Sequence, residues 1–346
     1  MVFKNFVNIL IDRKIQQLNS NKDPYLMNGS MGLAVFLSIL HKKTNCDSYL
    51  NKAKELLDGL SNDIQLGSVP LEIFRGLCGI GLGVVCLHAY GVIKEDPDII
   101  LNDIDNYIYK KSIDALSAYD VKYENTYLDI LLYISIRFQH THSPEEKEIF
   151  CKLWFALYNK LYQNLTPDFF IEPIPSTIKY KMAQFILVSA LGVILDIKFK
   201  ERISKIFNEI SNFIFSYIPQ LHFNRLILFA SVKQILNVID VSEKWHNYQD
   251  RLFSMISIKN IIENEILPND LYLSHGLPCL YYLLKELNIF ISQSIVDLII
   301  AKIKKSDLAK FDYFQLVKSN FNGLDGIFSV ILMLIELKPN LLNEEN

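Results

Sequence analysis

A motif of two glycines three residues apart, followed by an apolar run, recurs along the chain and constrains its fold more than any other feature. It occurs as NGSMGLAVFLSIL from Asn28, RGLCGIGLGVVCL from Arg75 and NGLDGIFSVILML from Asn322. A fourth copy, HGLPCLYYLLKEL from His275, keeps the first glycine and has Cys279 in place of the second. Because only 13 of the 346 residues are glycine, this clustering indicates an internal repeat.

Three further apolar blocks lie between the glycine-containing copies and lack the motif. With Thr126, Phe185 and Ser231 taken as equivalents of the first glycine, there are seven blocks with a period of about 47 residues. More charged segments with helical spacing separate the blocks, and Ser143 followed by Pro144 predicts the start of one of them. The blocks run past ten residues with apolar side chains at helical spacing, which favours helices over strands.

Each repeat is therefore predicted to be a pair of helices, and seven pairs account for nearly the whole chain as a single domain, residues 1–346. Glycine at the start of alternate helices favours a closed ring of inner helices over an open stack. A glycine carries no Cβ, so backbones can approach closely there. The expected fold is all-α, an α/α toroid of about seven helix-pair repeats with GxxG starts on the inner helices, near Gly29, Gly76, Gly276 and Gly323.

Composition excludes several classes of protein. Apolar residues make up 50% of the chain and charged residues 21%, which excludes disorder, and a net charge of −3 gives no sign of a nucleic-acid partner. Five scattered cysteines, an odd number, indicate reduced thiols and a cytoplasmic protein. The longest uncharged stretch, Gly76–Ile93, holds five glycines and is interpreted as a buried core helix, so no membrane span is expected.

The chain resembles the lanthionine synthetase C-like (LanC-like) family over essentially its full length. The resemblance is carried by RGLCGIGLG, LSHGLPC and the terminal NGLDGIFSVILMLIEL, at the repeat spacing described above. It implies an α/α toroid of seven double-helix repeats. Active members of that family hold one catalytic zinc with two cysteines and a histidine. A substrate cysteine joins as the fourth ligand and adds, as a thiolate, to a dehydrated residue to close a thioether ring.

The residues that the resemblance assigns to this zinc site have largely been replaced. Phe229 stands at the first cysteine position in the fifth repeat, and the family's Cys-His-Gly in the sixth repeat reads Ser274, His275, Gly276, so that only the histidine is kept. Gln184 stands at the place of the family's acid/base histidine. A shift of register does not restore these groups, because no cysteine lies between Cys151 and Cys279 and no histidine between His142 and His222. No metal and no other cofactor are therefore expected.

The function predicted from these residues is that of a zinc-free and non-catalytic protein of a peptide-modification pathway, which binds a peptide or a modification-enzyme partner. Whether the chain is an enzyme stays open. One alternative is a peptide cyclase that forms thioether rings without the usual zinc site. Another is an α/α-toroid enzyme such as a glycosidase, for which Asp129 and Asp325 would supply paired carboxylates. His275 and Cys279 share a helix face but are too few to hold a metal by themselves.

Overall fold

A computed structural model describes residues 3–21, 23–63, 67, 69–117, 124–196, 198–240, 242–309 and 323–339. Within these ranges every regular element is a helix and there is no strand. The all-α class and the organisation in helix pairs are thus confirmed.

The chain forms two compact units. The first consists of Met1–Ile108, Leu267–Tyr282 and Ser292–Asn346, and the second of Tyr109–Ile266 and Leu283–Ile291. The boundaries between them fall at or near the middle of α6 (Asn102–Ser117), within α14 (Leu277–Glu286), and in the segments just before α14 and α15. The single domain expected over residues 1–346 stays a prediction.

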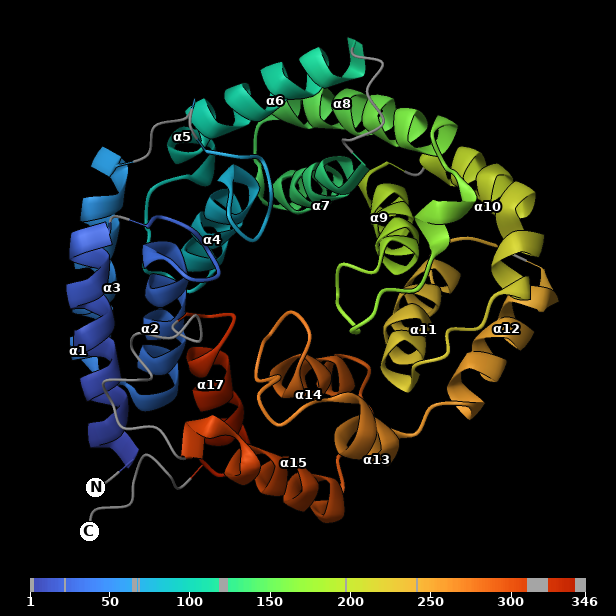
Figure 1. Cartoon of the computed structure of the whole chain (residues 1–346). Coiled ribbons are helices and arrows are strands. Elements are labelled where there is room, and N and C mark those ends of the chain that lie inside the picture. The colour runs from blue at the N-terminus through green and yellow to red at the C-terminus, as the bar shows by residue number, and fades with distance from the viewer. Residues whose placement is uncertain are drawn as a thin grey trace. The chain divides into compact units, whose positions relative to one another are not determined.

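The second unit has two layers of helices (Figure 1). In the first layer α9 packs against both α7 and α11, and the helices that follow them, α8, α10 and α12, form the other layer. The bounds are α7 Glu124–His140, α8 Pro144–Gln163, α9 Lys181–Leu195, α10 Phe199–Ser216, α11 His222–Leu236 and α12 Glu243–Ser254, with short turns η3 Pro167–Phe170, α13 Ile258–Asn260 and η4 Ile261–Glu265.

Sequence explains which layer each helix joins. Most side chains of α9 are buried, in agreement with its apolar sequence, whereas α10 buries only one face. At the start of α8 the Ser143 side chain accepts a hydrogen bond from the Glu146 N–H, and Pro144 occupies the first helical position, so the predicted cap is confirmed.

In the first unit, helices from the beginning and the end of the sequence pack against one another. Its helix α2 packs against α3, α4 and α17, and the rings of Phe36 and Phe328 stack with centroids 4.4 Å apart. The Asp325 N–H also donates to the Met27 carbonyl at 3.1 Å. The bounds are α1 Phe3–Asn21, α2 Ser30–Thr44, α3 Asp47–Asp63, α4 Leu77–Ala89, α5 Pro97–Ile100, α15 Gln293–Lys305, η5 Asp307–Ala309 and α17 Ile327–Leu337. The first and seventh helix pairs are therefore in direct contact within the first unit.

The first glycine of the motif is required by the loop that precedes the helix. At Gly29, Gly76 and Gly276 an added Cβ would lie within 3 Å of the backbone of the loop six and four residues earlier. The residue after each glycine donates its N–H to that loop, as in Ser30 to Asp23 and Leu77 to Pro70, both 2.8 Å. The GxxG motif thus specifies a loop that folds back over the helix start.

Helix starts agree with the glycine positions in three copies and differ elsewhere. Helices α2, α4 and α14 begin directly after Gly29, Gly76 and Gly276. In the seventh copy α17 begins after Gly326 rather than near Gly323, because Gly323 packs against the backbone of the Met27 loop. Where glycine is missing, the positions taken as equivalents of the first glycine fall inside the helices: α9 begins at Lys181, ahead of Phe185, and α11 begins at His222, ahead of Ser231.

The predicted core helix in Gly76–Ile93 is α4, and most of its residues are buried. Among the described helices, none combines the length and the apolar character needed to cross a membrane.

Candidate functional site

The retained histidine lies in the loop directly before α14, in the first unit. Ser274 beside it is buried and donates its backbone N–H to Asp325 Oδ1 at 2.7 Å and its hydroxyl to Asp325 Oδ2 at 2.9 Å. His275 Nδ1 lies 2.7 Å from the same hydroxyl oxygen. Because the hydroxyl proton goes to the carboxylate, Nδ1 of His275 is assigned as the donor to the hydroxyl oxygen, and in the neutral imidazole Nε2 is then the acceptor nitrogen.

Burial and hydrogen bonds shift the pKa values of two side chains in this cluster, Asp325 and Cys279. Burial raises the pKa of the Asp325 carboxyl, whereas the hydrogen bonds from Ser274 and the nearby His275 act in the opposite direction. The Tyr272 ring stacks on the His275 ring, with centroids 4.5 Å apart and planes 18° apart. Burial, with a further contribution from Asp325, raises the pKa of the Cys279 thiol, so this sulfur is protonated at neutral pH.

The start of α11, in the second unit, is built without glycine. Two carboxylates that are distant in sequence, Glu172 and Glu265 at the end of η4, each accept two successive backbone N–H groups there. The four donors are Gln220, Leu221, His222 and Phe223, at 2.7, 2.9, 2.7 and 2.9 Å. Negative charge is favoured at a helix N-terminus, and these bonds pair donors that a helix leaves unsatisfied.

Two polar residues in the first turn of α11 complete this arrangement. The fully buried Asn224 donates its amide hydrogens to Glu172 Oε1 and to the Pro173 carbonyl, both at 2.9 Å. Arg225 donates from Nε to the Pro219 carbonyl at 2.6 Å. The sequence did not reveal this role, because Glu172, the partner of Asn224, lies 52 residues earlier in the chain.

The two remaining predicted site residues lie inside helices of the second unit. Phe229 is buried in the middle of α11, and its ring lies 5.0 Å from that of Phe253. Gln184 lies in the first turn of α9 and is half-buried, with its backbone N–H donated to the Tyr180 carbonyl. Phe229 carries no atom that can bind a metal.

Over the described ranges, no three His, Cys, Asp or Glu side chains lie together in a way that could hold a metal ion. The two carboxylates considered for glycan cleavage belong to different units, with Asp129 buried on α7 and Asp325 bound to Ser274.

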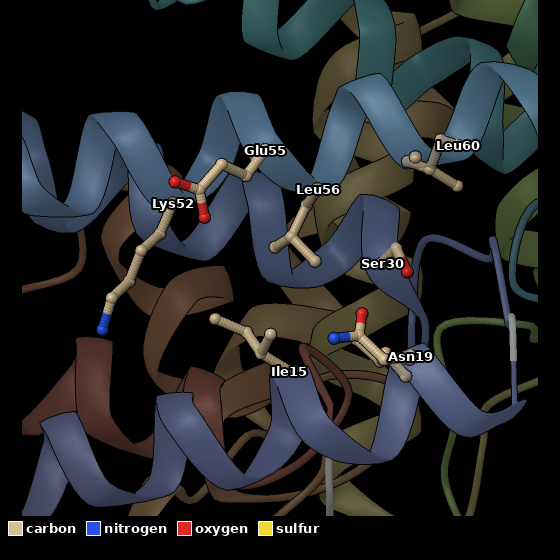
Figure 2. Close-up of a pocket in the computed structure, with 9 residues that line it drawn as sticks. Ile15, Asn19, Ser30, Lys52, Glu55, Leu56 and Leu60 are labelled. Atoms are coloured by element: carbon tan, nitrogen blue, oxygen red, sulfur yellow. The ribbon is translucent and has the colours of Figure 1, made fainter.

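The described residues of the first unit line hollows at two places. One, which we call the α2–α17 groove, has a volume of about 570 Å³ and is lined by side chains of α2, α14 and α17 and by Tyr90 after α4. The other has a volume of about 400 Å³ and lies between α1 and α3 (Figure 2). Figure 2 shows Ile15 and Asn19 of α1 opposite Lys52, Glu55 and Leu56 of α3, with Ser30 at the start of α2.

The hollow between α1 and α3 is a gap in helix packing whose charged wall is already paired in part. The Lys52 ammonium lies 2.6 Å from the Asp12 carboxylate on α1. The α2–α17 groove, by contrast, reaches the loops of the sixth and seventh repeats, because Leu273 and Leu324 line it next to Ser274 and Asp325.

Comparison with known proteins finds one related family. The family model described as "Lanthionine synthetase C-like protein" matches residues 4–167. This range ends before Gln184, Phe229, Ser274 and His275. No curated protein matches the chain.

Proposed function

Since the chain belongs to the lanthionine synthetase C-like family, we propose that it is a member without zinc chemistry that binds a peptide or a partner protein in a peptide-modification pathway. The proposal includes a cytoplasmic location, supported by five free cysteines. It also includes a single domain, supported by the contact between the first and seventh helix pairs.

The observation that carries this proposal is the state of Ser274. A catalytic zinc keeps three protein ligands, usually thiolate, imidazole or carboxylate, and one open position. The Ser274 hydroxyl stands where the family has a thiolate, and it is already bonded to Asp325 and His275. The residues present therefore do not fit the family's zinc.

The fifth repeat supports the same conclusion in either register. Phe229 offers no ligand atom. Counted from the start of the helix instead, the position that corresponds to Ser274 is Pro219, two residues before the N-cap Leu221. Neither residue binds a metal, and Gln184 on α9 cannot exchange a proton near neutral pH as an acid/base histidine does.

Elemental analysis of the purified protein tests the proposal. We expect well under one equivalent of zinc, and a melting temperature that a chelator leaves unchanged, because His275 and Asp325 are too few ligands for tight binding. The His275→Ala variant serves as the control and should have the same metal content. One equivalent of zinc that is lost in this variant would refute the proposal.

One observation favours a second candidate, an enzyme that acts without zinc. The chain of hydrogen bonds from Asp325 through Ser274 to His275 orients the imidazole and leaves Nε2 able to accept a proton. A peptide that contains both cysteine and dehydroalanine would distinguish the two. Loss of its free thiol with the native protein but not with His275→Ala would establish the enzyme, and an unchanged thiol supports the binding protein.

A further inference from the structure

The α2–α17 groove has the size and lining of a ligand site. Its volume of about 570 Å³ falls in the range of small-molecule and peptide side-chain pockets. Val35 and Ile39 of α2 and Leu332 of α17 make up much of its wall, with Leu273 and Leu324 from the two adjacent loops. The body of the groove therefore suits an apolar group.

The acidic group of the groove is already neutralised. Glu336 pairs with the Lys43 ammonium at 2.9 Å and accepts a hydrogen bond from the Tyr281 hydroxyl at 3.1 Å. Its charge is balanced and both its oxygens are engaged, so it offers little to a cationic ligand.

Two hydrogen-bond donors of the groove are unused by the described residues. The Lys42 ammonium is exposed, lies 5.0 Å from the centre of the Tyr90 ring and has no carboxylate partner there. The half-buried Tyr282 hydroxyl likewise has no hydrogen-bond partner among those residues. Burial and the nearby Glu336 raise the pKa of Tyr282, which keeps its hydroxyl proton in place.

These groups together select a kind of ligand. The apolar walls favour burial of an aliphatic or aromatic side chain, while Lys42 contributes one uncompensated positive charge to the lining and Tyr282 contributes a hydroxyl donor. A basic segment would be repelled by the two lysines of α2. A polar segment would leave the apolar walls without an apolar contact.

We propose that the α2–α17 groove binds a peptide segment with an apolar side chain and an adjacent carboxylate, with Lys42 and Tyr282 holding the carboxylate. This inference rests on the proposed peptide-binding function and assigns it a site. The apolar side chain enters between Ile39 and Leu332.

The test uses the full chain and two synthetic peptides that differ in one group. Acetyl-Gly-Leu-Phe with a free carboxylate and the same peptide as the carboxamide are titrated by calorimetry. We expect the acid to bind about tenfold more tightly than the amide, since a charge-assisted hydrogen bond is lost in the amide. This difference should shrink at high salt because the Lys42 contact is exposed.

Three variants locate the site. Lys42→Glu and Tyr282→Phe should each weaken binding of the acid about tenfold and leave the amide little affected. Lys54→Glu, on the exposed face of α3, is the matched charge control and should bind as the native chain does. Circular dichroism of each variant confirms that its helices are intact.

Other outcomes overturn the inference. Equal binding of acid and amide, or binding that neither groove variant changes, would show that the peptide carboxylate is held elsewhere or not at all. Failure of both peptides to bind would also reject the groove as the site. The proposed function is judged separately, because the zinc content of the protein does not depend on either peptide.

Discussion

The Gly76→Ala variant is expected to lose about 3 kcal/mol of unfolding free energy, and the Gly59→Ala variant to gain about 0.5–1 kcal/mol. At Gly76 a new Cβ would lie within 3 Å of the backbone of Pro70 and Glu72, and backbone atoms cannot move aside as a flexible side chain does. At Gly59, in the C-terminal half of α3, nothing lies within 4 Å and alanine is the better helix former.

Urea unfolding followed by circular dichroism measures both variants. The same substitution is made in both, in the same unit, so their opposite signs separate the packing of the loop from the general effect of alanine. A Gly76→Ala variant as stable as the native protein would show that the loop does not fold over the start of α4 as described.

The Glu265→Ala variant is expected to lose about 3 kcal/mol. The change leaves the backbone N–H groups of His222 and Phe223 without their acceptor at the start of α11, and each hydrogen bond to a charged group contributes about 1.5–3 kcal/mol. Glu265→Gln retains one acceptor oxygen and should lie between the native protein and Glu265→Ala.

Glu263 offers a control from the same short turn. It lies 3.9 Å from Lys259 in an exposed pair, so Glu263→Ala should change the stability by no more than about 0.5 kcal/mol. Equal losses in Glu263→Ala and Glu265→Ala, in thermal or urea unfolding, would contradict the capping role of Glu265.

Local patterns were enough to predict much of the fold. The helix starts after Gly29, Gly76 and Gly276 and the cap at Ser143 depend on residues within seven positions of one another. The apolar blocks likewise predicted the helices, because an apolar run longer than ten residues at helical spacing has few other interpretations.

The start of α11 could not be predicted from local patterns. Glu172 caps residues 48 and 49 positions further along the chain, and Glu265 caps residues 43 and 42 positions before it. No spacing rule connects such pairs. The polar Asn224 and Arg225 moreover resemble loop residues in sequence, whereas Asn224 is fully buried in the first turn of α11.

The same holds for the candidate site. Gly276 marks the start of α14, so His275 lies in the turn before the helix and the predicted helix face shared by His275 and Cys279 is wrong. Asp325, the partner of Ser274, lies 51 residues beyond it and had been considered only as a helix-start acid or a catalytic carboxylate. The role of a side chain across two repeats becomes visible only when the repeats are packed.

The contact between α2 and α17 bears on how the chain is made. Lys43 and its partner Glu336 are 293 residues apart, so at ~5–20 residues per second a ribosome needs roughly 15–60 s to add the second after the first. For that time the face of α2 that receives Phe328 lacks α17. A chain that stops before residue 323 never provides this cover, and its first repeat keeps Phe36 available to chaperones or to other nascent chains.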